Sequence, residues 1–454
     1  MKEINKNDKY IVDIIDNGSN GEGIAKIENF TIFINGAIKG EKCEILIVKV
    51  LKNYGFGKLI NIIEKSNKRA DVDCSAYSKC GGCHLRHFKY EDTLLLKQEL
   101  VQNLFNKGLK KKYNVLPTIG MDNPFYYRNK AQYPVGLNMN NEVSFGVFAE
   151  RSHRIIDNNG CLIQKKISNE IASSIIKVFR DNNISVYNEE KLDGTLRHIN
   201  IRTSKDEKEI MVTLVFNEEL EKELENRLIN SLVNEFKSIK TIVKNINSNN
   251  TNVILGEEEH VLYGDGYIED RLGDYTFRIS SKSFYQVNPI QCEKLYSYAL
   301  ENSDLTKDDV FIDLYCGIGT IGIFASKYVK EVVGIEIVED AVKDAKENSK
   351  INNIDNIRFI VGDVEKAFDD LINKEKIKPT VICVDPPRKG LDENTINNIK
   401  KIKPEKLTYI SCNPATLVRD LKELEDIYEI KLIQPVDMFP YTKHVECCSV
   451  LKLR

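Results

Sequence analysis

The strongest constraint on the fold is the alternation of short apolar runs with helical stretches from about residue 283 to residue 454. Runs this short and this apolar are typical of strands buried on both faces, and helices between them favour parallel connections. The pattern therefore predicts a doubly wound parallel α/β sheet. In such a sheet, ligands bind beyond the carboxyl ends of the strands, so the polar residues there become candidates for a site. The runs lie at residues 310–314, 332–336, 358–361, 381–384 and 407–410.

The first of these strands ends in a glycine-containing turn that opens a helix. Gly317 and Gly319 let the backbone approach a ligand closely, and Asp313 can accept hydrogen bonds there. Glu336 ends the second strand, where an acidic residue suits the two hydroxyls of a ribose. The turn lacks the full G-x-G-x-x-G spacing and a Walker lysine, which argues against nicotinamide cofactors and ATP. Together the turn and the distal acid resemble the S-adenosylmethionine site of Rossmann-like methyltransferases, and a tight turn without a ligand is the alternative.

Two later strand ends carry a carboxylate and a thiol. Asp385 precedes two prolines that hold the loop rigid and extended. Cys412 lies between a strand and the start of a helix, and a helix N-terminus favours the thiolate form. A thiolate that adds to carbon 6 of uracil makes carbon 5 nucleophilic enough to take a methyl group from a sulfonium. Cys412 is therefore the predicted nucleophile, with an inert buried thiol as the alternative.

The final strand places one carboxylate, Glu446, beside an otherwise apolar run. After methyl transfer, a base must remove the proton on carbon 5 before the thiolate can leave. Glu446 is the best candidate for that base, and a salt-bridge role is the alternative. Cys292, Cys316 and Cys383 lie in apolar stretches, so we expect them to be buried and inert.

The front of the chain differs in pattern and in charge. Residues from about 8 to 64 alternate apolar and polar positions between glycine-rich turns, which predicts a small β-barrel. Such barrels often hold single-stranded RNA, although a purely structural barrel is the alternative. Residues 1–133 carry 22 Lys and Arg against 15 Asp and Glu, which is compatible with a nucleic-acid partner. The expected domains are residues 1–65 (barrel), 66–282 (mixed α+β) and 283–454 (parallel sheet).

A cysteine cluster opens the central domain. Cys74, Cys80 and Cys83 follow a C-x5-C-x2-C spacing, and Cys161 is the preferred fourth ligand. Four thiolates suit zinc or a 4Fe–4S cluster, and the spacing does not decide between them; a metal-free reduced set is the remaining alternative. The N-terminus has no apolar signal core, and no apolar run approaches the roughly 18 residues of a membrane helix. We therefore expect a cytoplasmic protein with no membrane partner and reduced thiols, acting as a monomer.

Together these motifs resemble those of the RNA uracil-C5 methyltransferase family over nearly the whole chain. The resemblance implies Cys412 as nucleophile and Glu446 as proton acceptor. It also implies that Gln286, Tyr315 and Glu336 surround S-adenosylmethionine together with Asp385, which would also lie near the uracil. The matching segments are residues 127–130, 196–198, 283–288, 313–320, 385–390, 411–414 and 444–446.

The resemblance carries further expectations about architecture and substrate. It implies an OB-like TRAM barrel, a Rossmann-like class I methyltransferase domain, and a 4Fe–4S cluster rather than zinc. Members of the type with barrel and cluster usually methylate 23S rRNA, where a single-stranded loop makes the target base accessible, and tRNA is the alternative. A cytosine-C5 methyltransferase would need an acidic residue or a second cysteine arranged for cytosine, and the Asp385 motif carries no such second cysteine. A non-catalytic RNA-binding factor would not need the complete set of candidate residues.

Overall fold

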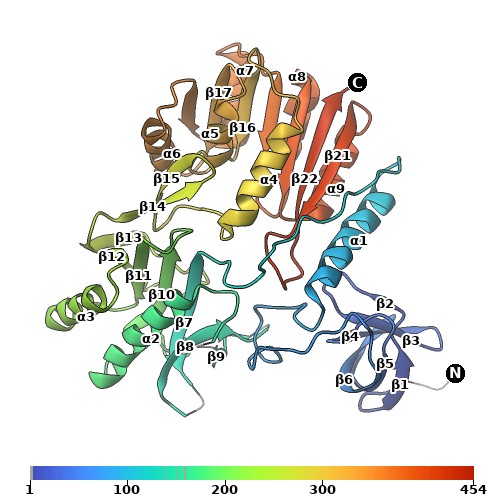
Figure 1. Ribbon diagram of the computed structural model, residues 1–454, viewed down its shortest axis with the longest axis vertical. Coiled ribbons are helices and arrows are strands. Elements are labelled where there is room, and N and C mark those ends of the chain that lie inside the picture. The colour runs from blue at the N-terminus through green and yellow to red at the C-terminus, as the bar shows by residue number, and fades with distance from the viewer. Residues whose placement is uncertain (1–3, 139, 151, 158–159) are drawn as a thin grey trace.

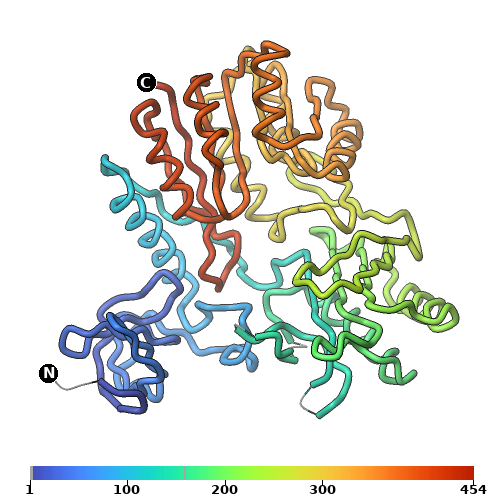
Figure 2. Tube along the Cα trace, turned by 180° about the vertical axis from the view of Figure 1, so that it is seen from behind, coloured from blue at the N-terminus to red at the C-terminus, as the bar shows by residue number. Residues whose placement is uncertain are grey.

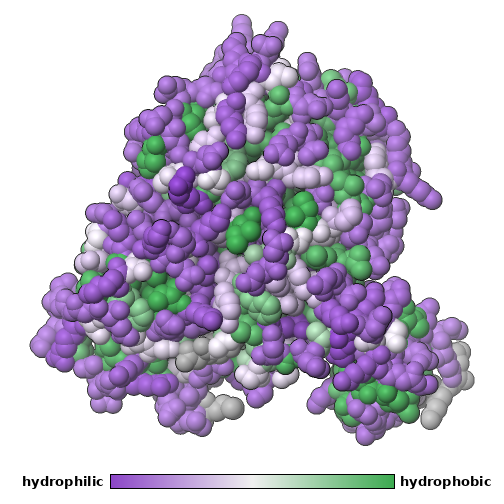
Figure 3. All heavy atoms as spheres, in the orientation of Figure 1, coloured by the Kyte–Doolittle hydropathy of each residue, from purple (hydrophilic) through white to green (hydrophobic). Residues whose placement is uncertain are grey.

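The computed structural model describes residues 4–138, 140–150, 152–157 and 160–454. In these ranges the strands form sheets of six, seven, two and seven strands, in that order along the chain (Figure 1). None of the helices described there combines the length and the apolar character needed to cross a membrane. Figure 3 shows a mostly hydrophilic surface with scattered apolar patches, one of them on the N-terminal barrel.

The N-terminal sheet is the predicted barrel. Its strand order is β1-β5-β6-β4-β3-β2, and a contact between β1 and β3 curls the sheet. Alternation along the strands buries one face completely, with Ile32, Ile34, Ile45 and Ile47 at its centre. The strands are β1 (Lys9–Asp13), β2 (Asp16–Asn17), β3 (Gly23–Ile27), β4 (Phe30–Asn35), β5 (Lys42–Val50) and β6 (Tyr54–Glu64).

The segment after the barrel connects it to the C-terminal sheet. A loop at residues 65–89, which carries three of the cysteines, leads into helix α1 (Tyr90–Gly108). This helix packs on α9 (Pro414–Leu424) and β21 (Tyr428–Val436), and it buries Val101 and Phe105 in their core. Residues 90–108 therefore belong to the packing of the C-terminal sheet, although they are far from it in sequence.

The central domain is a mixed sheet with order β13-β12-β11-β10-β7-β8-β9. Helices α2 (Lys166–Asp181) and α3 (Lys222–Glu235) bury their apolar faces against it. The strands are β7 (Lys130–Leu137), β8 (Val143–Phe148), β9 (Ile155–Asp157), β10 (Leu196–Thr203), β11 (Ile210–Phe216), β12 (Ile239–Ile246) and β13 (Glu258–Tyr263).

A hairpin of β14 (Tyr267–Leu272) and β15 (Tyr275–Ser280) follows the central sheet. Its buried residues join the core of the C-terminal domain, where it contacts α4 (Pro289–Glu301) and α6 (Glu339–Ile351). Because α1 and this hairpin both pack on the C-terminal domain, the domain boundaries at residues 65 and 282 stay predictions.

The C-terminal sheet confirms the predicted doubly wound fold. Its order is β18-β17-β16-β19-β20-β22-β21, and every pair is parallel except those of β22, which runs antiparallel between β20 and β21. The order in which strands are added reverses between β16 and β19, since β17 and β18 lie on one side and β19 and β20 on the other, and such sheets bind ligands at this point. The strands not yet given are β16 (Val310–Leu314), β17 (Glu331–Glu336), β18 (Ile357–Val361), β19 (Val381–Val384), β20 (Lys406–Ser411) and β22 (Glu446–Leu453).

Helices cover this sheet, as expected for strands buried on both faces. They include α5 (Thr320–Ser326), α7 (Val364–Asn373) and α8 (Glu393–Ile402), besides α4, α6 and α9. Between β21 and β22 the chain makes a long loop at residues 437–445, which we call the base loop. Figure 2 shows it in red, extending from the C-terminal sheet between the barrel and the central domain.

Candidate active site

The topology brings three of the predicted residues to one edge of the sheet. Register pairs Ser411 at the end of β20 with Cys447 near the start of β22. The neighbours of that pair, Cys412 and Glu446, therefore come together beyond the strand ends. Asp385 follows β19, which pairs with β20, so it lies at the same edge.

Burial and mutual charge perturb these three groups strongly. Glu446 is only 2% exposed, and burial followed by the charge of Asp385 raises the pKa of its carboxyl to about 8. Burial alone raises the pKa of Asp385 to about 7. The half-buried thiol of Cys412 has its pKa raised to about 11, first by burial and then by Glu446 and Asp385. Strongly perturbed groups clustered at a strand edge are typical of an active site.

The state of Cys412 differs from the expectation based on helix position. Asn413 does cap α9, since its side chain accepts a hydrogen bond from the Ala415 N–H at 3.2 Å. However, burial and the adjacent carboxylates outweigh the favourable helix terminus and raise the pKa of the thiol. When Glu446 is protonated, its negative charge no longer raises the pKa of the Cys412 thiol. Ionisation of Cys412 is therefore coupled to the protonation of its neighbours.

Arg388 is a member of this group that the sequence analysis did not single out. Its positive charge lowers the pKa of both Cys412 and Glu446 and so opposes the effects of burial. It lies three residues after Asp385 in the same loop at the strand edge. The sequence did offer a signal for Arg388, because it is a cation that follows a candidate carboxylate just beyond the end of a strand.

The glycine turn after β16 is held by two acidic side chains. The buried Asp313 accepts the Gly322 N–H through Oδ2 at 2.9 Å, and its other oxygen has no partner among the described residues. Burial is the main cause that raises its pKa to about 8. Glu336 accepts the Gly317 N–H at 3.1 Å and the Val338 N–H at 2.9 Å. The predicted cofactor residues after β16 and β17 therefore lie together.

The two glycines of this turn have different surroundings. Gly317 and Gly319 adopt positive φ angles of 53° and 82°. A Cβ at Gly317 would meet no atom within 4 Å, whereas one at Gly319 would lie 2.7 Å from the Phe359 ring. Tyr315 also has a positive φ of 66°, and its hydroxyl donates to Asp392 at 3.4 Å. The backbone is thus exposed to the site at Gly317 and tightly packed at Gly319.

Apolar side chains follow Glu336 on the surface. Ile337 is 62% exposed and Val338 is 52% exposed, directly beyond the carboxylate that ends β17. Large exposed apolar side chains beside an acidic strand end suit a planar base next to a ribose. The sequence analysis did not predict these two residues. They continue the apolar run of a buried strand, and the sequence does not show that their side chains are exposed.

The central domain and the base loop hold the segment that carries Gln286. The Asn129 side chain donates to the backbone carbonyl of Gln286 at 3.1 Å, and Arg202 donates to that of Ser283 at 2.9 Å. Asn288 caps α4 and donates to the Met438 carbonyl at 3.0 Å, which links this segment to the base loop. The charges of Asp385 and Glu446 reach the thiol of Cys292 on α4, which is buried as expected.

The four predicted metal ligands also come together, at a different place. Cys74, Cys80, Cys83 and Cys161 line one cavity of about 210 Å³. Among the residues that the structure describes, however, no three of these cysteines are arranged so that they could hold a single metal ion. Cys43 is instead buried in the core of the barrel. The structure therefore supports the grouping of the four cysteines but shows no metal site.

Comparisons with known proteins bear on the whole chain. Residues 89–454 match the family model described as tRNA (Uracil-5-)-methyltransferase, and residues 5–60 match the TRAM domain. A relative named as an uncharacterized RNA methyltransferase of Clostridium acetobutylicum is 46% identical over 453 residues, covering 99% of this chain and 98% of the relative. A second with the same description, from Halalkalibacterium halodurans, is 45% identical over 99% of this chain and 98% of its own length.

A solved structure matches the fold across nearly the full length. It is the tRNA (uracil-54, C5)-methyltransferase of Pyrococcus abyssi in complex with S-adenosyl-L-homocysteine, with a TM-score of 0.77 and 25% identity. The match covers 97% of this chain and 100% of that chain. These findings confirm the expected TRAM barrel and methyltransferase fold, and they favour uracil over cytosine and an enzyme over a binding factor. The chain belongs to the RNA uracil-5 methyltransferase family, whose methyl donor is S-adenosylmethionine.

Proposed function

We propose that this protein methylates carbon 5 of a uridine in a single-stranded loop of 23S rRNA through a covalent bond between Cys412 and carbon 6 of the uracil. The grouping of Cys412, Asp385 and Glu446 beyond the strand ends is the observation that carries the proposal. The protein would act as a monomer in the cytoplasm.

The first step would form the bond between Sγ of Cys412 and carbon 6. The electron pair of the carbon 5–carbon 6 double bond moves into the ring as an enolate, for which Arg388 supplies a nearby positive charge. S-adenosylmethionine, when bound, supplies an electrophilic methyl group. Carbon 5 takes that methyl group, and S-adenosylhomocysteine is the leaving group. Asp385 lies between the strand ends of the cofactor turn and Cys412, where it can orient the ring.

The second step would release the product. Glu446 takes the proton from carbon 5, the double bond re-forms, and the bond between carbon 6 and Sγ breaks to return the Cys412 thiolate. Glu446 accepts this proton only as a carboxylate, so its raised pKa matters for the rate. Burial makes it a stronger base than an ordinary glutamate once it is ionised.

The cofactor would lie across the glycine turn. Gly317 offers open backbone, Glu336 can accept the ribose hydroxyls, and the exposed Ile337 suits the face of the adenine. Asp313 and Tyr315 would support the turn from below, and Gln286 would approach from the segment before α4. The partnerless oxygen of buried Asp313 fits a site that receives a further hydrogen-bond donor.

RNA that contains 5-fluorouridine provides the test of the chemistry. Fluorine replaces the proton that Glu446 would remove, so the adduct cannot break down after methyl transfer. We expect a denaturation-resistant protein–RNA complex that requires S-adenosylmethionine and contains the Cys412 peptide. A complex that joins the RNA through another residue would contradict the proposal.

We propose that the four cysteines hold a 4Fe–4S cluster rather than zinc, as the family resemblance implies. All four line one cavity of about 210 Å³, and four thiolates suit such a cluster. Protein purified without oxygen should absorb visible light and contain iron and sulfide. A colourless, zinc-containing preparation would overturn the assignment.

Transfer RNA is the second candidate substrate. The matching Pyrococcus abyssi enzyme is named for uracil 54 of tRNA, and the match extends over the barrel as well as the catalytic domain. Mapping of 5-methyluridine in 23S rRNA and in tRNA from cells with and without the gene separates the two. Loss of the modification from tRNA alone would replace the 23S rRNA proposal with this one.

A further inference from the structure

The base loop contains a residue in a strained backbone conformation. Tyr441 has a φ of 62°, in the left-handed region that bulky side chains rarely adopt, and it is only 8% exposed. Such a conformation costs free energy and persists only where the contacts around it hold it in place. Strained residues are concentrated at functional sites, and Tyr441 lies five residues before Glu446.

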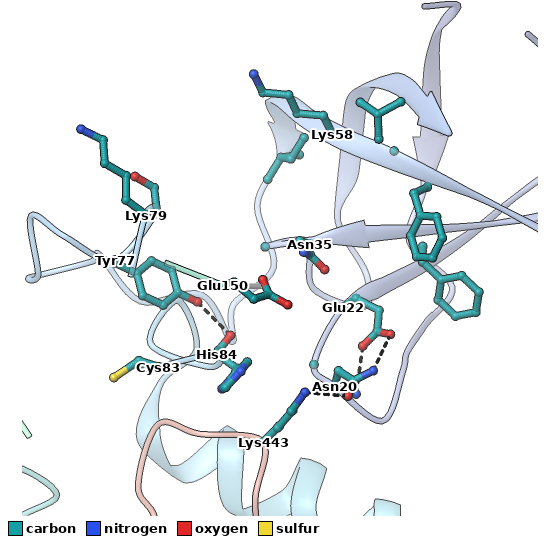
Figure 4. A pocket seen from close by; sticks show the side chains of 18 of the residues that line it. Asn20, Glu22, Asn35, Lys58, Tyr77, Lys79, Cys83, His84, Glu150 and Lys443 are labelled. Atoms are coloured by element: carbon teal, nitrogen blue, oxygen red, sulfur yellow. Dashed lines mark hydrogen bonds between the residues drawn. The ribbon is translucent and has the colours of Figure 1, made fainter. Parts of the chain in front are cut away.

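The backbone of Tyr441 is held by the loop at residues 65–89, which we call the cysteine-bearing loop. The backbone N–H groups of His84 and Leu85 both donate to the Tyr441 carbonyl, each at 2.9 Å. The Tyr77 hydroxyl donates to the carbonyl of His84 at 2.8 Å (Figure 4). The peptide units that bind the base loop are therefore fixed within the cysteine-bearing loop itself.

The side chain of Tyr441 contacts the same loop. Cζ of Arg86 lies over the Tyr441 ring, 4.6 Å from its centre, and Arg86 is only 3% exposed. Asp73 accepts from Arg86 through both carboxylate oxygens, at 2.5 and 3.0 Å, which fixes the plane of the guanidinium. Cys74 follows Asp73, and Cys83 precedes the two backbone donors. The contact between the two loops therefore adjoins the cavity of four cysteines.

Only a short, ordered segment separates Tyr441 from the proposed base. The Thr442 hydroxyl accepts the His444 N–H at 3.2 Å, and Val445 is buried in the core of the C-terminal sheet. Glu446 is the first residue of β22, so its orientation depends on the turn that leads into the strand. A displacement of Tyr441 would reach Glu446 through this segment.

We propose that Tyr441 is a positioning residue: the cysteine-bearing loop holds it in its strained conformation, and Tyr441 in turn places Glu446 for removal of the proton from carbon 5. In that step the proton passes to the carboxylate, the C–H electron pair re-forms the double bond between carbons 5 and 6, and the Cys412 thiolate leaves with the electrons of its bond. Addition of Cys412 does not use Glu446, so the contact between the loops acts on the second step alone. This effect on the reaction rests on the proposed function.

Rapid-quench reactions separate the two steps. With total RNA from cells that lack the gene, Tyr441→Ala should slow product release about 10- to 100-fold, because misplacement of a reacting group by about 1 Å costs up to that much. Methylated protein–RNA adduct should then accumulate on denaturing gels. RNA from the same cells grown with 5-fluorouracil is captured before the base acts, so the variant should capture it at the wild-type rate. Equal slowing of capture and release, or no slowing of release, would overturn the proposal.

Three further variants separate positioning from a general loss of structure. Tyr441→Phe keeps the ring beneath Arg86 and should release product at the wild-type rate. Tyr187→Ala is the matched control, because it removes a ring that lies 4.2 Å from Cζ of Arg197 in the central domain, and it should change neither step. Glu446→Gln combined with Tyr441→Ala should accumulate no more adduct than Glu446→Gln alone, because Tyr441 acts through that carboxylate. Additive effects in the double variant would overturn the proposal.

Hydrogen exchange of the protein without RNA tests the contact between the loops independently of the chemistry. Tyr441→Ala and Arg86→Met should each accelerate exchange at residues 442–446 at least about tenfold and leave β20 protected. If the wild type captures no 5-fluorouridine RNA but exchange rises in this way, the positioning stands and the proposed chemistry is wrong. If capture succeeds and exchange at these residues is unchanged in both variants, the positioning is wrong and the chemistry survives.

Discussion

Lys97 of α1 and Asp437 form a buried ion pair, with Nζ and Oδ1 2.5 Å apart and side chains only 1% and 0% exposed. Asp437 begins the base loop, directly after β21. Tyr90 donates to its other carboxylate oxygen at 2.9 Å, and Lys97 also donates to the Phe439 carbonyl at 3.2 Å. Helix α1 therefore fixes the start of the loop that ends at Glu446.

Loss of this pair should be costly. Lys97→Met would leave the carboxylate of Asp437 buried without its cation, and we expect the free energy of unfolding to fall by about 3–5 kcal/mol. Urea denaturation measures the change. Lys431→Met is the matched control, because that lysine is 47% exposed and pairs with Glu429 at the surface. The double variant Lys97→Met with Asp437→Asn should recover part of the loss, and no recovery would argue against an uncompensated charge.

Removal of the thiol should abolish methylation. Cys412→Ala lacks the atom that adds to carbon 6, so we expect the rate to fall by more than about 10³-fold and covalent capture of 5-fluorouridine RNA to disappear. Calorimetric titration with S-adenosylhomocysteine should show unchanged cofactor binding. Cys43→Ala, in the barrel core, serves as the control and should retain capture. Normal turnover by Cys412→Ala would exclude the covalent mechanism.

Replacement of the proposed base should trap the reaction halfway. In Glu446→Gln the bond to carbon 6 can form, but the proton on carbon 5 has no acceptor, so a methylated adduct with ordinary uridine RNA should accumulate. In the wild type the carboxyl has a pKa of about 8 and must be ionised, so the rate should rise with pH through that value. Gel analysis of the adduct and a pH–rate profile measure both effects. If Glu446→Gln keeps the wild-type pH–rate profile, the rise in rate near pH 8 belongs to another group.

The same carboxyl should make the protein less stable as the pH rises. The folded pKa of about 8 exceeds the ordinary value of 4.5, so the folded state binds the proton more tightly than the unfolded state. Its contribution is therefore fully present below about pH 4.5 and is lost as the pH rises through about 8. Urea denaturation between pH 5 and pH 9 should show this decline, and Glu446→Gln should flatten it. An identical decline in the variant would assign it to Asp313 and Asp385, whose pKa values are also raised.

The cofactor turn can be tested with one methyl group. Gly319→Ala combines a positive φ of 82° with a Cβ 2.7 Å from the Phe359 ring, so it should displace the turn. We expect the affinity for S-adenosylhomocysteine to fall at least about tenfold, measured by calorimetry. Gly40→Ala is the control for strain alone, because Gly40 has a φ of 86° but no atom within 4 Å of the added Cβ. Equal cofactor affinity in the two variants would remove the role assigned to the turn.

Much of this site was predictable because strand ends are visible in a sequence. Polar residues at or just after the end of an apolar run all lie at the carboxyl edge of one sheet; they include Asp313, Glu336, Asp385 and Cys412. Glu446 was predictable from its isolation in an apolar strand, but its position beside Cys412 depends on the antiparallel insertion of that strand. No local pattern specifies such an insertion.

Other properties of the site depend on packing between distant segments. The raised pKa of Cys412 comes from burial and from two carboxylates on other strands, so helix position alone gave the wrong sign. The attachment of α1 to the base loop rests on Lys97 and Asp437, which are 340 residues apart. A lysine in an amphipathic helix ordinarily faces solvent, and nothing near it in the sequence shows that it is buried.

The insertion of β22 also has a consequence for how the chain reaches its folded state. This strand is the last of its sheet along the chain, yet it lies between β20 and β21 and pairs with both. Until it enters, β20 and β21 each present an unpaired edge, which is a hazard for association with other chains. Its pairing with β20 joins segments that are separated by α9, β21 and the base loop, and such non-local pairing is slow in folding. The strand that begins with Glu446 therefore completes the sheet and protects it from aggregation.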